Sequence, residues 1–508
     1  MRPSNALVWL LMVACGAQDP VPETQPPAVP DPVVEQVKPP PPPPPPTIDA
    51  PWFPGLAKEE QLQRVDFAPV ERPAYLLLIV DTLRADALGV YGQTEPTSPF
   101  LDQLARNGVV FVNHTSNSTW TRSSVASLLT GMYPNQHGVL ELNRPLSKKR
   151  VTIAERFKEA GFSTATVLAN PIVGKRYGLT QGYDFVAEPS THFGGKHPSA
   201  KQVFGVAKKW LEKHKDESFF LSTLVFDPHH PYTPGKARKE AFCPECDPSP
   251  IVHPQREYRG ALPTEKQVED MKALYHAEVR ETDQAIARFF GWLESSGLAD
   301  RLTTIVVADH GEAFGEHKVF EHAFHMWDEV VRTPLILSGA AIRSRGFVDA
   351  PTQHVDVVPT LGRLAGWPEI PESAGLPLVQ HSTESGLLHD RPTVSEVEMY
   401  GIHRLSVRHG SLKLVRHEPL NETRFLKYYD RLDVYPSVAR KTGRWELYDL
   451  KKDPLETTNL AGDDIETHPL AAALKQYREN TFPDQLGLPD DGPSDQLVED
   501  LKALGYLE

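Results

Sequence analysis

The segment YLLLIVD, from Tyr75 to Asp81, is a continuous apolar run that ends in a carboxylate. Such a run is typical of a strand that is buried on both faces of a parallel sheet. The segment TTIVVAD, from Thr303 to Asp309, repeats the pattern and is followed by His310. We therefore predict an α/β fold in which two buried strands each deliver an aspartate to one edge of a sheet.

Two further apolar runs have the same design. Residues 163–169 precede Asn170, and residues 219–226 precede the sequence DPHHPY, which begins at Asp227. Ligands of open α/β sheets bind beyond the carboxyl ends of the strands. All four loops should therefore open on one edge of the sheet.

A fifth stretch, WTRSSVASLLTGMYP, runs from Trp120 to Pro134 and contains a predicted helix from Ser123 to Leu129. Thr121 lies just before this helix, whose first backbone N–H groups can face an anion. A threonine hydroxyl is a poor nucleophile at neutral pH unless a base or a metal activates it. Two aspartates, this hydroxyl and one imidazole form a mixed oxygen and nitrogen donor set, which suits Mn²⁺ or Zn²⁺ better than Ca²⁺.

The stretch around Thr121 resembles the signature of the sulfatase family, in the alkaline-phosphatase-like superfamily. In that signature a cysteine or serine precedes a proline and an arginine, and the run closes on Leu-x-Thr-Gly, as residues 128–131 do here. Thr121 stands at the modified cysteine, Ser123 at the proline and Val125 at the arginine. DPHHPY and DHGEAFGEH, residues 309–317, follow in the family's order. The resemblance covers roughly residues 74–508 and implies a three-layer α/β/α sandwich with a smaller C-terminal α+β subdomain.

The resemblance also implies the chemistry. Sulfatases oxidise the cysteine or serine to formylglycine, which a threonine cannot become, whereas phosphodiesterases and phosphoglycerol or phosphoethanolamine transferases of the superfamily use threonine. The implied metal ligands are Asp81, Thr121, Asp309 and His310. Thr82 stands where many sulfatases have a second aspartate, which again points away from calcium. We expect one Mn²⁺ or Zn²⁺ ion, with a second ion as an open alternative.

The expected substrate contacts come from several loops. His229 of DPHHPY corresponds to a family histidine that touches the ester, so we expect a catalytic role for it. His317 and His325, in one cluster with His322, can hold the leaving group, donate a proton or complete a second metal site. Three further candidates for substrate contact are Asn170 and Lys175, in a segment unlike the family's, and Arg122.

Four domains are predicted along the chain. Residues 1–15 resemble a lipoprotein signal peptide that ends in Cys15, and residues 16–70 form a proline-rich tether. Residues 71–375 form the catalytic domain, with a long helix over residues 268–293. Residues 376–508 form the C-terminal subdomain, with a hairpin that turns at His409-Gly410 and a tail helix over residues 495–504. We therefore expect a lipoprotein exported to the bacterial cell envelope, periplasmic or attached to the outer membrane.

Cys243 and Cys246 lie in the sequence FCPECDP. In an exported protein they predict a small disulfide, and a zinc site that includes His253 is the alternative.

These features favour a metal-dependent hydrolase of sulfate or phosphate esters with Thr121 as the nucleophile. An envelope transferase or phosphodiesterase, and a binding module without catalysis, are the alternatives. The expected partner is an anionic ester, on a glycan or an envelope polymer, and the membrane is reached through the N-terminal lipid. A net charge of −14 disfavours nucleic acid.

Overall fold

The computed structural model describes residues 61–141, 144–195, 197–246, 263–381, 390–425 and 443–480. The predicted signal peptide, most of the tether and the predicted tail helix lie outside these ranges. Within them, no helix combines the length and the apolar character needed to cross a bilayer.

A mixed eight-stranded sheet forms the centre of the described fold, in the order β12-β3-β11-β8-β2-β7-β5-β6. Its strands are β2 (Ala74–Val80), β3 (Val109–Phe111), β5 (Ser163–Leu168), β6 (Phe185–Ala187), β7 (Phe219–Val225), β8 (Leu302–Ala308), β11 (Leu335–Gly339) and β12 (Gly346–Val348). β11 runs antiparallel to both of its neighbours. The sheet is therefore parallel at its centre and mixed toward the β12 edge.

The four predicted strands are β8, β2, β7 and β5, and they are adjacent and parallel. Val80 pairs with Val225 on one side and with Ala308 on the other, so the residues that follow these three strands start at the same level. All seven residues of β2, β7 and β8 are buried. The continuous apolar runs thus mark strands covered on both faces, as predicted.

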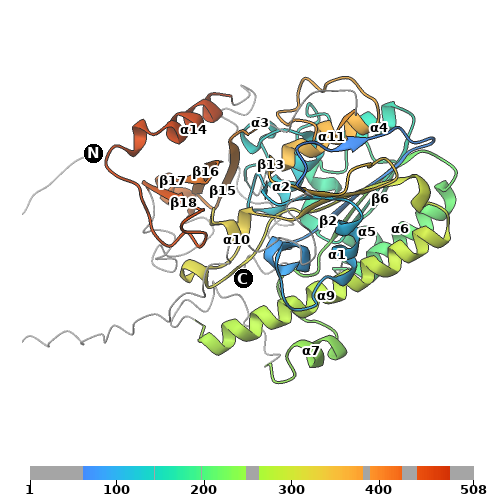
Figure 1. Ribbon diagram of the computed structural model, residues 1–508, viewed down its shortest axis with the longest axis horizontal. Coiled ribbons are helices and arrows are strands. Elements are labelled where there is room, and N and C mark those ends of the chain that lie inside the picture. The colour runs from blue at the N-terminus through green and yellow to red at the C-terminus, as the bar shows by residue number, and fades with distance from the viewer. Residues whose placement is uncertain are drawn as a thin grey trace, which may run out of the picture. The chain divides into compact units, whose positions relative to one another are not determined.

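Helices cover both faces of this sheet (Figure 1). One layer contains α1 (Pro99–Arg106), α6 (Ala200–His214) and α9 (Glu265–Ser295), and the other contains α2 (Thr121–Thr130), α4 (Ile153–Glu159) and α11 (Val357–Leu364). The three-layer α/β/α architecture is therefore confirmed. The long helix α9 begins three residues before the predicted start, because Thr264 caps it by accepting a hydrogen bond from the N–H of Gln267.

A separate antiparallel sheet follows, drawn in brown to red in Figure 1. It contains β15 (Thr393–Met399), β16 (Ile402–His409), β17 (Leu412–His417) and β18 (Arg444–Asp449), and α14 (Pro469–Glu479) packs on it. This confirms the smaller C-terminal subdomain, whereas its boundary near residue 375 stays a prediction. The hairpin turns at Gly410-Ser411, one residue later than predicted, because His409 pairs with Leu412.

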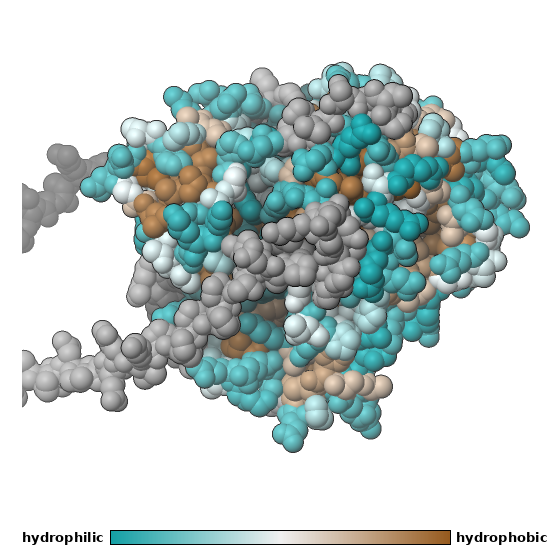
Figure 2. All heavy atoms as spheres, viewed as in Figure 1, coloured by the Kyte–Doolittle hydropathy of each residue, from teal (hydrophilic) through white to brown (hydrophobic). Residues whose placement is uncertain are grey.

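Short elements complete the described fold. The short strands pair as β1 (Asp66–Phe67) with β14 (Gln380–His381), β4 (His114–Thr115) with β13 (Thr352–Gln353), and β9 (Ala313–Phe314) with β10 (Phe320–Glu321). The short helices are α3 (Pro134–His137), α5 (Pro189–His192), α7 (Lys236–Phe242), α10 (Asp328–Val331) and α12 (Glu422–Phe425). Hydrophilic residues occupy much of the face in Figure 2, and the exposed large apolar side chains in the described ranges are Leu376, Leu455 and Leu460.

Candidate active site

Asp81 and Asp309 follow the neighbouring strands β2 and β8, and both are fully buried. Asp81 Oδ2 accepts a hydrogen bond from Asn170 Nδ2 at 2.9 Å. Asp309 Oδ1 accepts from the N–H of Thr82 at 3.2 Å and from the N–H of His310 at 2.8 Å. The second oxygens, Asp81 Oδ1 and Asp309 Oδ2, are buried without a hydrogen-bond partner in the described part of the chain. Each carboxylate is therefore held by one oxygen and keeps the other available.

The orientation of His310 follows from its own backbone neighbour. Its Nδ1 lies 3.0 Å from the carbonyl oxygen of Gly311. A carbonyl oxygen only accepts, so Nδ1 carries a proton, and in the neutral imidazole the lone pair is on Nε2. Nε2 lies 3.4 Å from Asp309 Oδ2, 3.9 Å from Asp81 Oδ1 and 3.1 Å from Thr121 Oγ1. The structure therefore brings the four predicted ligand residues together.

The group formed by Asp81, Asp309 and His310 can hold a metal ion. Burial raises the pKa of Asp81 well above its ordinary value, and the neighbouring charge of Asp309 raises it further. Burial also raises the pKa of Asp309, against the lowering effect of His310. Two buried carboxylates side by side are costly unless a cation neutralises them. The two available oxygens and the Nε2 lone pair therefore fit a divalent cation.

Thr82 supports this group through its backbone. It has a φ of 52°, a left-handed conformation that is unfavourable for a β-branched residue. In this conformation its N–H donates to Asp309, and its carbonyl oxygen accepts from the hydroxyl of Tyr275 at 2.9 Å. The sequence indicates at this position only the absence of a second carboxylate, because no residue pattern predicts a strained backbone.

Thr121 is the first residue of α2, two residues earlier than the predicted helix start. Trp120 precedes it in an extended conformation and makes no side-chain cap. The first N–H groups of a helix lack intrahelical partners and attract anions. Ser124 anchors this end of the helix, because its hydroxyl donates to the carbonyl oxygen of Asp309 at 2.6 Å. The nucleophile candidate and the metal group thus belong to one hydrogen-bonded unit.

Two more histidines lie against this unit. The ring of His322 is 4.3 Å from that of His310 and 5.0 Å from that of His229, between centroids. His322 Nδ1 lies 3.0 Å from Glu312 Oε1. His229 Nδ1 donates to the carbonyl oxygen of His230 at 2.6 Å, and burial lowers the pKa of His229 well below its ordinary value. His229 is therefore neutral near pH 7, with its lone pair on Nε2.

The expected substrate contacts His317 and His325 share a neighbour, Trp327, and their role in binding substrate stays a prediction. Their rings stack on Trp327, with centroids 4.0 Å and 5.2 Å away. His325 Nδ1 is also 3.3 Å from Arg404 Nη1 of β16. Of this cluster it is His322 that contacts His310. Residue spacing does not separate the three histidines, because the left-handed backbone at Glu321 and Ala323, which flank His322, changes the direction of the loop there.

The other three expected contacts also differ from one another. Asn170 is fully buried and positions Asp81, with its own Oδ1 accepting from the N–H of Ile172 at 3.2 Å. The Arg122 guanidinium is buried, donates to the Ile172 carbonyl at 2.8 Å and lies 3.6 Å from the ring centroid of Tyr177. Lys175 is exposed. Asn170 thus acts on a metal-ligand candidate. Roles for Arg122 and Lys175 in binding substrate stay predictions.

Comparison with known proteins is consistent with this geometry. Residues 73–367, more than half of the chain, match the family model described as Sulfatase. An ulvan-active sulfatase of Formosa agariphila is 28% identical over 320 residues, which are 57% of this chain and 61% of that protein. A Delta 4,5-hexuronate-2-O-sulfatase of Bacteroides thetaiotaomicron is 25% identical over 444 residues, 77% of this chain and 85% of that protein. A solved phosphonate monoester hydrolase of Agrobacterium radiobacter has a TM-score of 0.63 at 19% identity, covering 83% of this chain and 99% of its own, and so shares the fold.

Proposed function

Because the chain belongs to the sulfatase family, we propose that it is a divalent-cation-dependent hydrolase of anionic esters in which Thr121 is the nucleophile. One observation carries the proposal. The Thr121 hydroxyl lies at the first residue of α2, 3.1 Å from His310 Nε2, beside two carboxylates that each keep one oxygen available.

Asp81, Asp309, His310 and the hydroxyl of Thr121 would hold the cation, which supplies positive charge against the anionic ester and lowers the pKa of the threonine hydroxyl. One nitrogen among oxygen donors favours Mn²⁺ or Zn²⁺ over Ca²⁺. The N-terminus of α2 adds backbone N–H groups on the side from which an anion meets Thr121.

In the proposed reaction, the Thr121 hydroxyl releases its proton to solvent, and Thr121 Oγ1 attacks the sulfur or phosphorus atom to form a covalent threonine ester. The bond from that atom to the alcohol oxygen of the substrate breaks, and the leaving oxygen takes a proton from the Glu312–His322 pair. Water then attacks the same sulfur or phosphorus atom and returns a proton to the Glu312–His322 pair, while the departing Thr121 oxygen takes a proton from solvent. The neutral Nε2 of His229 can accept a hydrogen bond from a hydroxyl group of the substrate.

The preferred ester follows from the absence of an aldehyde group on threonine. A formylglycine releases sulfate through its aldehyde hydrate, whereas a threonine ester must be opened by water at the central atom. This favours phosphorus over sulfur and keeps a phosphodiesterase or an envelope transferase as the second candidate. The relatives named for ulvan and for a hexuronate sulfate support a glycan as the carrier of the ester.

The test is turnover by the full chain, after chelation and after addition of Mn²⁺, Zn²⁺ or Ca²⁺, on matched aryl sulfate, aryl phosphate and bis-aryl phosphate. We expect cleavage of a phosphate ester that requires Mn²⁺ or Zn²⁺. Preference for the diester would support the second candidate, and cleavage of sulfate alone would overturn the choice of phosphorus. Absence of cleavage across these esters and sulfated or phosphorylated glycan fragments would favour a binding module without catalysis.

We also propose that Cys15 carries a lipid that holds the protein at the bacterial cell envelope. The proposal rests on the sequence alone: residues 12–15 read MVAC, and a proline-rich stretch follows them. Cys15→Ser should move the protein from the membrane fraction to the soluble fraction of fractionated cells. An unchanged distribution would overturn the anchor.

A further inference from the structure

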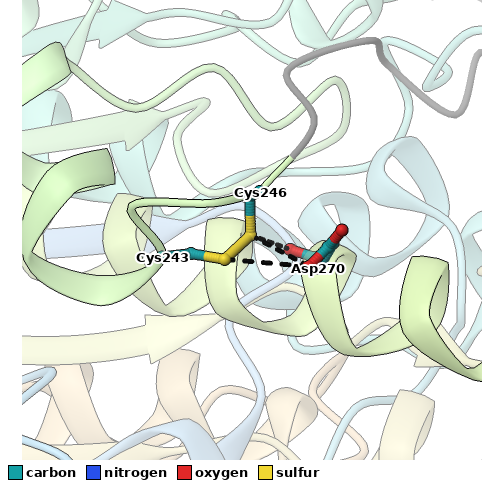
Figure 3. A group of neighbouring side chains, drawn as sticks. All are labelled: Cys243, Cys246 and Asp270. Carbon is teal, nitrogen blue, oxygen red and sulfur yellow. Dashed lines mark hydrogen bonds between the residues drawn. A yellow bond between two sulfur atoms is a disulfide. The ribbon is translucent and has the colours of Figure 1, made fainter.

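Two cysteines and an aspartate form a small cluster (Figure 3), which shares no residue with the proposed catalytic group of Asp81, Thr121, Asp309 and His310. Cys243 follows the end of α7, Cys246 lies three residues later, and Asp270 projects from α9. The two cysteines form a disulfide, which confirms the prediction for this pair. Asp270 was not anticipated, because it lies more than twenty residues further along the chain.

The contacts in this cluster are unusual for its oxidised state. Asp270 Oδ1 lies 3.3 Å from Cys246 Sγ and 3.7 Å from Cys243 Sγ. Neither a disulfide sulfur nor a carboxylate carries a proton, so no hydrogen bond can join them in that state. Thiols could donate to the carboxylate, and a cation could be shared by all three groups. The three atoms thus have the arrangement of a ligand set.

We propose that reduction of the Cys243–Cys246 disulfide converts this cluster into a binding site for a soft divalent cation such as Zn²⁺. Both sulfur atoms and the carboxylate of Asp270 bind the ion, and water takes the fourth position. A dithiol reductant supplies two electrons and two protons, becomes a disulfide itself and leaves two cysteine thiols. Binding of the cation then releases both thiol protons.

The geometry allows this change without movement of the backbone. The Cα atoms of the two cysteines are 5.3 Å apart. Tetrahedral zinc with bonds of about 2.3 Å to sulfur requires sulfur atoms roughly 3.8 Å apart. Rotation about the Cα–Cβ bonds can separate the sulfur atoms by that amount. Thiolate ligands also distinguish this cluster from the catalytic group, whose donors are oxygen and nitrogen.

Burial and charge favour a bound cation at this place. Cys246 is 3% exposed, while Cys243 and Asp270 are half-buried, which leaves one side open to a water ligand. Lys266, one helical turn before Asp270, already pairs with its carboxylate. This exposed ammonium shows that positive charge is accommodated here, and its flexible side chain can withdraw when a stronger cation binds.

The cluster joins helix α9 to the segment that follows DPHHPY, the loop that contains His229. The chain after DPHHPY is tied to α9 by Thr233, whose N–H donates to Glu278, and by Gly235, whose N–H donates to Glu281 at 2.8 Å. Cys243 and Cys246 continue this segment, and Asp270 lies on the same helix. A metal bridge there would add a further tie between the segment and α9. The proposal does not depend on the proposed esterase function.

The experiment uses the full chain with Cys15→Ser, so that two cysteines remain. After reduction with a dithiol and removal of the reductant under argon, the protein is titrated with Co²⁺, which gives near-ultraviolet charge-transfer absorption when bound by thiolate. We expect Co²⁺ to produce this absorption up to the intensity of one ion bound per chain at this cluster, whatever amount of Co²⁺ the catalytic group takes up, and Zn²⁺ to remove it. The catalytic group has no sulfur and contributes nothing to the signal.

Variants separate the ligands from their neighbours. Cys243→Ser should lose the absorption, and Asp270→Asn should bind Co²⁺ at least tenfold more weakly. Lys266→Ala should retain the absorption, because the lysine is no ligand. Absence of the absorption in the reduced protein would overturn the proposal. Equal Co²⁺ affinity of Asp270→Asn and the parent protein, with both folded by circular dichroism, would remove Asp270 from the site and overturn it as well.

Discussion

The position of one proton decides what His310 can do. Its Nδ1 proton is committed to the carbonyl oxygen of Gly311, so the Nε2 lone pair faces Thr121 and the two carboxylates. Without this backbone hydrogen bond the ring could adopt the other tautomer and present a proton to its neighbours. The same lone pair can either accept a hydrogen bond from the Thr121 hydroxyl or bind a metal ion.

Removing the Thr121 hydroxyl tests the nucleophile directly. Thr121→Ala should lower turnover by at least about 10³-fold and leave the fold intact, because one oxygen and one methyl group are removed. Thr121→Ser is the matched control, since it keeps the oxygen and should retain measurable turnover. Steady-state kinetics on the preferred ester, with circular dichroism of each variant, make the comparison. An active Thr121→Ala protein would refute the assignment.

Asn170 and Lys175 were expected to act alike, and the structure predicts that they differ. Asn170→Ala should weaken cation binding by about 10–100-fold, because Asp81 Oδ2 loses its hydrogen-bond donor. Lys175→Ala should leave cation affinity unchanged, because that side chain is exposed. Titration calorimetry with Mn²⁺ or Zn²⁺ on the two variants distinguishes them. Equal affinities would show that Asn170 does not position Asp81.

At the scale of elements, helix α1 receives its cap from another helix. Ser98, at its N-terminus, makes no side-chain cap. Asp283 of α9 accepts hydrogen bonds from the N–H groups of Leu101 at 2.8 Å and Phe100 at 3.2 Å. A helix of eight residues is marginal by itself. The long helix therefore both covers the sheet and stabilises its neighbour.

Asp283→Ala should lower the free energy of unfolding by about 1–3 kcal/mol, because two N–H groups of α1 lose their acceptor. Asp283→Asn keeps an acceptor oxygen and should cost less. Denaturant titration of both variants measures the difference. Equal losses would mean that the charge of Asp283, and not its hydrogen bonds to α1, is what stabilises the protein.

Helix α10 carries a carboxyl group that makes stability depend on pH. Burial, together with the charges of Glu316 and Glu456, raises the pKa of Glu329 to about 8. Since the folded protein then holds a proton that the unfolded chain releases near pH 4.5, unfolding becomes easier as pH rises from about 4.5 to about 8.

Glu329→Gln should therefore gain stability relative to the parent protein across this pH range. The gain should be on the order of 5 kcal/mol and should level off above about pH 8. Glu159→Gln, a change at an exposed position, is the control and should show no such trend. The measurement is the free energy of unfolding of each variant at several pH values. A pH-independent difference for Glu329→Gln would contradict the expected proton uptake.

At the scale of the whole molecule, a buried lysine links the C-terminal sheet to helix α10. Lys413 of β17 is 1% exposed, and its Nζ lies 2.8 Å from Asp328 Oδ1 of α10 and 2.9 Å from Glu456 Oε1. Glu456 also accepts from the N–H of Asp328 at 2.6 Å. A charge this deeply buried is tolerated because it is paired twice.

Lys413→Met keeps the volume of the side chain and leaves both carboxylates without their partner. It should lower the free energy of unfolding by about 3–5 kcal/mol. Lys451→Met, at an exposed position, should change it by less than about 0.5 kcal/mol. Denaturant titration of both variants decides the matter. A small loss for Lys413→Met would show that the paired charges contribute little to stability.

The sequence by itself determined the central strands of this protein and the residues at their carboxyl ends. Continuous apolar runs predicted the four central strands, because strands covered on both faces exclude polar residues along their whole length. Ligands of such sheets bind at the carboxyl ends of the strands. This predicted that Asp81, Asp309 and His310 lie close together, since Asp81 follows one strand and the Asp309-His310 pair follows the next. Thr121 joined them through its place in a recognisable motif.

Only the tertiary structure decided which neighbours of this group contact it. Loop dihedral angles decide that His322 contacts His310 and that the N–H of Thr82 reaches Asp309. A hydrogen bond between distant segments makes Asn170 a support for Asp81. Helix α9 likewise has to pack in its place before Asp270 can lie beside Cys243 and Cys246. The same packing brings Asp283 to the start of α1. Local patterns describe each segment by its own periodicity, whereas these contacts arise only when segments far apart in the chain pack together.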